Sequence, residues 1–199
     1  MPHLSLSLMT AVLLAYLCGS LSSAILICRW MKLPDPRSQG SNNPGATNVL
    51  RIGGKKAAIL TLLGDALKGF LPVILAKLYG FSSTELALIA CAAFLGHLYP
   101  VFFRFQGGKG VATAFGSLSG LAWPIGPILL ACWLTVAFIF RYSSLAALVT
   151  ALFSPICVGY FVNLDAACIA AFMSALLIYR HKSNIKKLWA GEEAKIGKK

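Results

Sequence analysis

The sequence predicts an all-α integral membrane protein with seven transmembrane helices, an N-terminus outside the cell and a C-terminus in the cytoplasm. Hydrophobic residues make up 58% of the 199 residues, the mean hydropathy is +0.76, and apolar runs long enough to span a bilayer (about 17–25 residues) recur. With seven spans, 16 of the 18 lysines and arginines fall on one side. The positive-inside rule makes that side cytoplasmic, whereas six or eight spans would scatter the charge.

The predicted spans follow from apolar runs that contain almost no charged residues. The first lacks a basic segment before its apolar run and is too long for a signal-peptide core, so we expect it to remain in the protein. The fourth is short, and a partly re-entrant segment is the alternative there. A single domain is expected over residues 1–199, with a basic cytoplasmic tail at about 181–199. The seven predicted spans are 4–28, 57–78, 85–103, 111–123, 124–140, 144–162 and 165–180.

The net charge of +12 points to anionic lipid headgroups and anionic substrates as partners, because the cations gather at one leaflet. Nucleic acid is not expected, since no soluble domain could carry it. The six cysteines lie in or beside apolar runs and show no metal-binding spacing, so neither a metal nor another cofactor is predicted.

A polar segment over residues 40–51 stands out between the first two spans. It holds two glycines, three asparagines and Arg51, and nearby prolines predict a loop, because proline interrupts helices. Such a loop can aim backbone N–H groups at an anion, and Arg51 could bind a phosphate in bidentate fashion. The alternative is a solvated connector. The prolines are Pro34, Pro36 and Pro44.

A second polar segment, Gly107-Gly108-Lys109-Gly110, precedes the fourth predicted span. Glycine-rich backbone, a lysine and a following helix N-terminus together resemble a phosphate cradle. The pattern is not a nucleotide-binding P-loop, which needs G-x-x-x-x-G-K-[ST] after a strand.

Two further pairs of polar residues have helical spacing. Asp65 and Lys68, at i and i+3 inside the second span, are costly in a membrane unless they pair or face a wet cavity. A structural pair and a substrate-facing pair both remain open. His181 and Asn184, also i and i+3, follow the last span, where a basic membrane anchor is the alternative. Ser144 lies on the same predicted side, so the polar segments converge on the cytoplasmic interface.

With these residues assembled, the chain resembles the PlsY family, the bacterial acyl-phosphate:glycerol-3-phosphate acyltransferases. The matching motifs are Gly-Ser-x-Asn-x-Gly-Ala-Thr-Asn at 40–48, Asp-x-x-Lys-Gly at 65–69, Gly-His-x-x-Pro at 96–100, Gly-Gly-Lys-Gly-Val-Ala-Thr at 107–113 and Arg-His-x-x-Asn-Ile at 180–185. Three positions depart from the family pattern: Asn42, Gly64 and Gln106. Asn42 is expected to strain a positive-φ turn only modestly, and Gln106 removes one cation.

The resemblance implies transfer of a fatty acyl group from acyl phosphate to the 1-hydroxyl of sn-glycerol 3-phosphate, giving lysophosphatidic acid and phosphate, the first acylation of phospholipid biosynthesis. It implies seven helices in the bacterial inner (plasma) membrane and an active site near the cytoplasmic face. An acyl-phosphate-forming enzyme is then the functional partner, and a monomer suffices. The resemblance assigns catalysis to Ser41, Arg51, Lys109, His181 and Asn184. Together with these five, the expected substrate- and phosphate-binding residues are Asn43, Gly45, Thr47, Asn48, Asp65, Lys68, His97, Gly107, Gly108, Gly110 and Ser144.

The chemistry favours a reaction without a covalent enzyme intermediate, because acyl phosphates are already activated and no Ser-His-Asp arrangement is evident. We expect the acyl phosphate's own oxygen to take the hydroxyl proton, with His181 or His97 as the rival general base. A small anion transporter is the alternative function, although the polar groups lie at one interface and no internal repeat is evident. A purely structural membrane protein would leave the glycine-rich segments without a role.

Overall fold

The computed structural model describes residues 5–197, and this part of the chain is entirely helical apart from its connections. Residue 4 of the first predicted span and residues 198–199 of the predicted tail lie outside the described residues. The helices are α1 (Leu6–Gly19), α2 (Ser23–Trp30), α3 (Ala46–Tyr79), α4 (Ser83–Leu98), the 3₁₀ turn η1 (Val101–Phe103), α5 (Val111–Leu121), α6 (Ile125–Phe140), α7 (Ser143–Phe161), α8 (Leu164–Arg180) and α9 (Lys182–Trp189).

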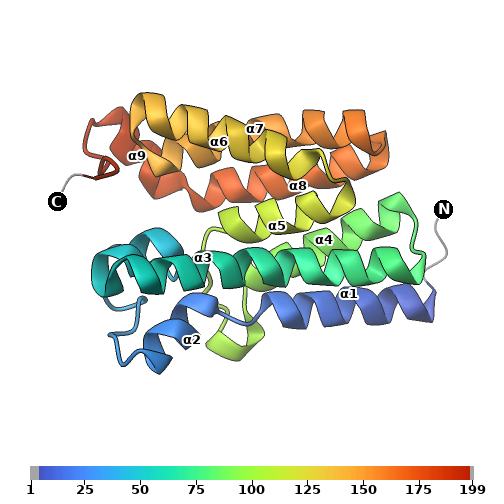
Figure 1. Cartoon of the computed structure of the whole chain (residues 1–199), viewed down its shortest axis with the longest axis horizontal. Coiled ribbons are helices and arrows are strands. Elements are labelled where there is room, and N and C mark those ends of the chain that lie inside the picture. Colours follow the sequence, from blue (N-terminus) through green and yellow to red (C-terminus); the bar gives the residue numbers. More distant parts are fainter. Residues whose placement is uncertain (1–4, 198–199) are drawn as a thin grey trace.

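The helices form an elongated bundle in which α1 and α3 lie along one side, α6, α7 and α8 lie along the other, and α4 and α5 lie between them (Figure 1). The principal packing pairs are α3 with α5, α1 with α4, and α7 with α8 and α6. The two ends of the described chain lie at opposite ends of the bundle (Figure 1). The loop between α2 and α3 shares one of these ends with α9, so residues distant in sequence meet there.

Glycines allow the central helices to pack at backbone distance. A methyl group on Gly116 would lie 2.0 Å from the carbonyl oxygen of Ala66, and one on Gly69 would lie 2.3 Å from that of Thr113. The pair of α1 and α4 uses Gly19 and Gly96 in the same reciprocal way. Such small-residue contacts are how helices associate in lipid, where burial of apolar surface gives little driving force.

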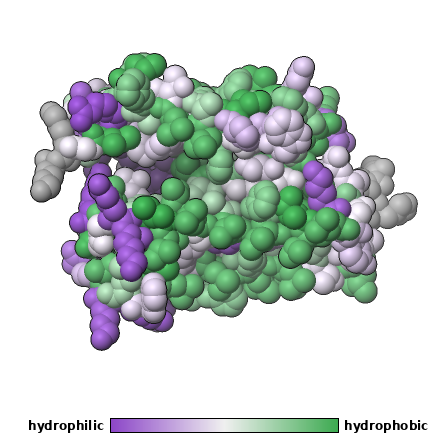
Figure 2. Space-filling model, in the orientation of Figure 1, coloured by the Kyte–Doolittle hydropathy of each residue, from purple (hydrophilic) through white to green (hydrophobic). Residues whose placement is uncertain are grey.

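The chain is a multi-pass membrane protein, and the described residues contain three helices long and apolar enough to cross a bilayer: α3, α4 extended through η1, and α7. Two bent pairs, α1 with α2 and α8 with α9, would make five. The predicted seven spans require the shorter apolar helices α5 and α6 to cross as well. On the face that Figure 2 shows, apolar residues cover the middle of the bundle, and strongly hydrophilic residues gather at the end that carries α2 and α9.

Two predicted elements differ from the observed ones. The predicted first span, 4–28, is broken between Gly19 and Ser23, with a bend of 42°. The break frees the carbonyl of Leu21, and the Lys68 ammonium donates to it at 2.7 Å, so the exposed backbone group is satisfied inside the bundle.

The prediction of a loop over 40–51 was also wrong for its second half, because α3 begins at Ala46 and includes Arg51. Asn48, in the first turn of this helix, bonds back to the preceding loop and is described with the site below. Gly54, with φ of 75°, then interrupts the helix and redirects it into its long apolar part.

Candidate functional site

The segment Gly107–Gly110 packs tightly against the end of α4. A methyl group on Gly107 would lie 2.1 Å from the carbonyl oxygen of His97, and one on Gly108 would lie 2.3 Å from Nε2 of the same histidine. Gly110 has φ of 87° and lies against the ring of Phe94. The three glycines therefore let the backbone lie directly on α4, and this packing fixes the position of Lys109 between them.

Arg180, the last residue of α8, holds this glycine-rich segment from the other side. One guanidinium nitrogen donates to the carbonyl oxygens of Gly107, at 2.9 Å, and Gly108, at 3.1 Å. The same guanidinium lies over the ring of Tyr99, 5.7 Å from its centroid. The end of the last apolar helix is thereby tied to the glycine-rich segment, although some 70 residues separate them.

Lys109, Asn184, Ser144 and Glu193 form one hydrogen-bonded cluster. The Lys109 ammonium donates to Oδ1 of Asn184, whose Nδ2 donates to Oε1 of Glu193 at 2.7 Å. The Ser144 hydroxyl donates to the same carboxylate oxygen at 2.6 Å. Four segments thus contribute to the cluster: the glycine-rich segment, the start of α7, α9 and the chain that follows it.

The cluster is rich in positive charge. Burial lowers the pKa of the Lys109 ammonium below its ordinary value, and the fields of the neighbouring cations Lys187, Arg180 and Arg51 lower it further. The Glu193 carboxylate acts in the opposite direction and stabilises the ammonium. A site with several cations, one of them half-buried, and two neutral donors is suited to an anion such as phosphate.

His181 lies at the break between α8 and α9 with only 3% of its surface exposed. Its Nδ1 lies 2.8 Å from the carbonyl oxygen of Leu177. Because a carbonyl can only accept, Nδ1 carries the proton, and the neutral ring therefore presents Nε2 as an acceptor. This tautomer is the one that could receive a hydrogen bond from a hydroxyl group.

The loop before α3 is held by Asn48, whose side chain is 1% exposed. Its amide donates to the carbonyls of Pro36 and Gln39, both at 2.9 Å, and its oxygen accepts from the N–H of Ser41, also at 2.9 Å. Asn42 has a positive φ, of 55°, a conformation that asparagine tolerates better than most non-glycine residues. The loop also meets the glycine-rich segment, since a methyl group on Gly108 would lie 3.0 Å from the carbonyl oxygen of Pro44.

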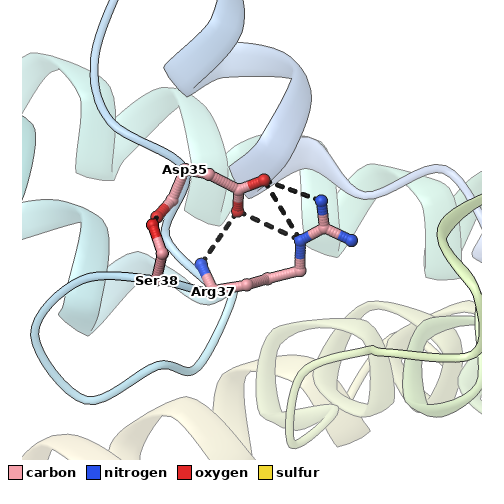
Figure 3. Close-up of polar contacts among 3 residues, drawn as sticks. All are labelled: Asp35, Arg37 and Ser38. Carbon is pink, nitrogen blue, oxygen red and sulfur yellow. Dashed lines mark hydrogen bonds and ion pairs between the residues drawn. The ribbon is translucent and has the colours of Figure 1, made fainter.

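Earlier in the loop, Asp35 and Arg37 form a forked ion pair, with contacts of 3.0 and 2.7 Å (Figure 3). The hydrogen bonds that the Arg37 guanidinium donates lower the pKa of the Asp35 carboxyl. Ser38 closes the turn by donating to the carbonyl of Asp35 (Figure 3). A polar cavity of about 310 Å³ lies between the loop and the glycine-rich segment and is lined by Arg37 and Arg180. Two of the three departures from the family pattern, Asn42 and Gln106, also line it.

Asp65 and Lys68 lie inside the bundle, apart from the Lys109 cluster. The ammonium of Lys68 is 2.8 Å from Oδ1 of Asp65, and both side chains are nearly inaccessible. Nδ1 of His97 lies 3.6 Å from the same oxygen and 3.1 Å from the Thr113 hydroxyl. Lys68 also donates to the carbonyl of Leu21, just after α1, so this group of side chains joins α1, α3, α4 and α5. The glycine-rich segment packs on His97, and the group therefore supports that segment.

The structure thus brings the predicted residues Lys109, Asn184, Ser144 and His181 together at one end of the bundle, with the positive field of Arg51 acting on Lys109. The other predicted residues fall into two groups. Asp65, Lys68, His97, Asn48 and the glycines have structural contacts in this state, whereas Ser41 and Thr47 are exposed and Asn43 is half-buried on the loop and the first turn of α3. Within residues 5–197 no group of three or more potential metal ligands occurs.

Sequence reasoning missed three residues of this site. Arg37 was counted only as positive charge near the membrane. Arg180 was counted as charge and as the first residue of the motif at 180–185, with no contact assigned to it, although it fixes the glycine-rich segment. Glu193 was not predicted at all. Its signal was available, because two of the chain's six acidic residues, Glu192 and Glu193, stand side by side in an otherwise basic tail.

Comparison with known proteins gives a consistent result. The model of a family described as glycerol-3-phosphate acyltransferase matches residues 9–191. A protein of that name from Methylococcus capsulatus is 57% identical, covering 93% of this chain and 94% of its own. Another, from Shewanella oneidensis, is 53% identical and covers 100% of this chain and 97% of its own.

Two solved structures are also similar to the chain. The crystal structure of PlsY (YgiH), described as an integral membrane glycerol 3-phosphate acyltransferase, in its glycerol 3-phosphate form has a TM-score of 0.90 at 38% identity, over 96% of both chains. The lysophosphatidic acid form has a TM-score of 0.87 at 36% identity, again over 96% of both chains. The sequence and the fold agree over nearly the whole length. The chain therefore belongs to the PlsY family of integral membrane glycerol-3-phosphate acyltransferases.

Proposed function

We propose that the chain transfers a fatty acyl group from acyl phosphate to the 1-hydroxyl of sn-glycerol 3-phosphate, forming lysophosphatidic acid and inorganic phosphate. The observation that carries this proposal is the cluster of Lys109, Asn184 and Ser144 in a positive field. Both substrates bear a phosphate, so a site that collects cations and neutral donors suits them.

Positioning supplies much of the proposed acceleration. Lys109 and Arg51 neutralise the two phosphates and allow them to approach, while Asn184 and Ser144 orient the bound anion. Holding two reactants in a reactive geometry can be worth about 7–11 kcal/mol of the barrier. Ser41 on the loop and Thr47 in the first turn of α3 are exposed, and we assign them to the same substrates.

The hydroxyl oxygen of glycerol 3-phosphate attacks the acyl carbonyl, the bond from the acyl carbon to the phosphate oxygen breaks, and the leaving phosphate takes the hydroxyl proton. This substrate-assisted transfer needs no enzyme nucleophile. His181 supports it as a neutral acceptor that orients the hydroxyl through Nε2. The buried contacts of His97 with Thr113 and Asp65 favour a positioning role for that histidine.

His181→Gln tests the proton transfer, because glutamine keeps a hydrogen-bonding amide but cannot take up a proton. A general base typically contributes about 10²–10⁴-fold. Substrate assistance therefore predicts a kcat within about tenfold of wild type. A loss of about a hundredfold or more, with normal folding, would make His181 the base.

We place the site at the cytoplasmic face of the bacterial plasma membrane, with seven spans, the N-terminus outside and a single chain as the active unit. Support comes from the gathering of strongly hydrophilic residues at the end that carries α2 and α9 (Figure 2) and from the two ends of the described chain lying at opposite ends of the bundle (Figure 1). An enzyme that forms acyl phosphate must then supply the donor from the same side.

The donor is tested with purified protein in detergent, given glycerol 3-phosphate and acyl donors of equal chain length. We expect lysophosphatidic acid from acyl phosphate, and a rate at least about a hundredfold lower from acyl-CoA, because a site built to bind a phosphate beside the carbonyl rejects a donor without one. Equal rates from the two donors would contradict the proposed donor.

A further inference from the structure

The one acidic group in the Lys109 cluster comes from the chain after α9. Glu193 accepts from Ser144 at 2.6 Å and from Asn184 at 2.7 Å, both on Oε1. Asn184 in turn accepts from the Lys109 ammonium. A carboxylate thus occupies the donors that the proposed reaction needs for a phosphate.

The chain reaches this position through a sharp reversal at the end of α9. Gly191 has φ of 70°, a conformation that glycine adopts without strain. The N–H groups of Gly191 and Glu192 bond back to the carbonyls of Leu188 and Lys187, which closes the helix end. The turn directs the following residues back toward α7, so Glu193 enters the cluster from outside the bundle.

The segment around Glu193 is held by few contacts and buries little apolar surface. Gly191, Glu192, Ala194, Lys195 and Ile196 are exposed. Its principal attachment apart from Glu193 is to Arg141, whose carbonyl accepts from the N–H of Ile196 at 2.6 Å and whose guanidinium donates to the carbonyl of Ile196 at 3.1 Å. Segments with few buried contacts open locally at low cost in free energy.

We propose that Glu193 is an internal competitor for the phosphate site: its carboxylate occupies the donors of Ser144 and Asn184 until a substrate phosphate displaces it. Two anions cannot share these donors, because their mutual repulsion at contact distance is large. A phosphate carries about 1.5–2 negative charges near neutral pH and the carboxylate carries one, so the exchange favours phosphate. The residue thereby sets the apparent affinity of the site and selects against weaker, singly charged anions. This inference rests on the proposed function only for the identity of the displacing ligand.

Competition of this kind lowers the measured affinity by the fraction of molecules in which the site is free. If Glu193 occupies the site in most molecules, removing its carboxylate should tighten phosphate binding by about tenfold or more. Glu193→Gln should have a smaller effect, since the amide oxygen can still accept from Ser144 but carries no charge.

The test is calorimetric titration of the full-length protein in detergent with inorganic phosphate and with glycerol 3-phosphate. The variants are Glu193→Ala and Glu193→Gln, with Glu192→Gln as the matched control, because it makes the same change of charge one residue away on an exposed side chain. We expect Kd to fall for both ligands in the Glu193 variants and to stay at the wild-type value in the control. A chain ended after Gly191 should behave as Glu193→Ala does.

Unchanged or weaker binding in Glu193→Ala would overturn the proposal, and weaker binding would make Glu193 part of the occupied site. An equal gain in Glu192→Gln would also overturn it, because bulk charge would then explain the effect. The titrations involve no acyl transfer, so they distinguish the two proposals. Tighter binding without lysophosphatidic acid formation would contradict only the proposed reaction, whereas formation of the product with unchanged binding would contradict only the competitor.

Discussion

Replacement of Gly108 by alanine tests how closely the glycine-rich segment depends on α4. The added methyl group would lie 2.3 Å from Nε2 of His97 and 3.0 Å from the carbonyl oxygen of Pro44. Ordinary contacts between heavy atoms are about 3.5–4.0 Å, so one side must move by about 1 Å. The imidazole has little freedom, because it is 6% exposed and contacts Thr113 and Asp65.

The backbone of the segment is therefore expected to move, and Lys109 with it. Overpacking of this kind costs about 1–3 kcal/mol of stability, and a displacement of about 1 Å at a catalytic group can cost about a hundredfold in rate. We expect kcat/KM for acyl transfer to fall by one to two orders of magnitude. Steady-state kinetics and thermal unfolding in detergent measure the two effects.

Gly159→Ala is the control, since its methyl group would meet nothing closer than the Cβ of Ala167 at 3.3 Å, at a position in α7 outside the site. Adding His97→Ala to Gly108→Ala should reduce the cost, because the two residues are in contact and their effects couple. Wild-type activity and stability in Gly108→Ala would refute the packing described for the segment.

Three further predictions concern residues that hold the site in place. Lys68→Met should lower the free energy of unfolding by about 3–5 kcal/mol, because it leaves Asp65 as a buried charge without its partner. Thermal unfolding measures this loss, and adding Asp65→Asn should recover part of it. Asn48→Ala should make the loop before α3 susceptible to limited proteolysis, because three hydrogen bonds worth about 0.5–1.5 kcal/mol each are lost. An unchanged cleavage pattern would show that Asn48 does not hold this loop in place. Arg180→Lys should lower kcat/KM by about tenfold or more, since lysine lacks the planar guanidinium of arginine. An unchanged kcat/KM would show that the contacts of Arg180 with the carbonyls of Gly107 and Gly108 do not position the glycine-rich segment.

Much of the architecture follows from local sequence. Apolar runs without charge predict helices in lipid, and the confinement of the basic residues predicts that the polar segments lie together. The structure confirms the helical class and the meeting of the loop before α3 with the glycine-rich segment. Lys109, Asn184 and Ser144 come together because α5 and α7 begin, and α8 is followed by α9, at that end of the bundle.

The structure differs from the sequence-based prediction where contacts between residues far apart in the chain determine the local conformation. The break at Gly19–Ser23 is stabilised by Lys68, which lies more than 40 residues away in the chain, so the apolar pattern of the first span does not reveal it. Asn48, in the first turn of α3, makes its hydrogen bonds with the backbone of the preceding loop. An asparagine in a polar motif suggests binding when only the sequence is considered, whereas three buried bonds identify it as a brace.

The roles of Glu193 and Arg180 could not be predicted from the sequence for a second reason. Each acts through a backbone reversal or a helix end that brings it to partners on other elements: Glu193 follows the end of α9, and Arg180 ends α8. Composition marks them only as charges. Their roles depend on hydrogen-bonding partners far away in the chain.

The most direct test of the central claim is the rate of lysophosphatidic acid formation by purified wild type and by Lys109→Met, with acyl phosphate and glycerol 3-phosphate as substrates. Methionine keeps most of the side-chain volume and removes the charge, so the fold should be retained. We predict product from wild type and a loss of at least about a hundredfold in the variant, the scale of removing one electrostatic stabiliser. No product from wild type, or equal rates from the two proteins, would contradict the account.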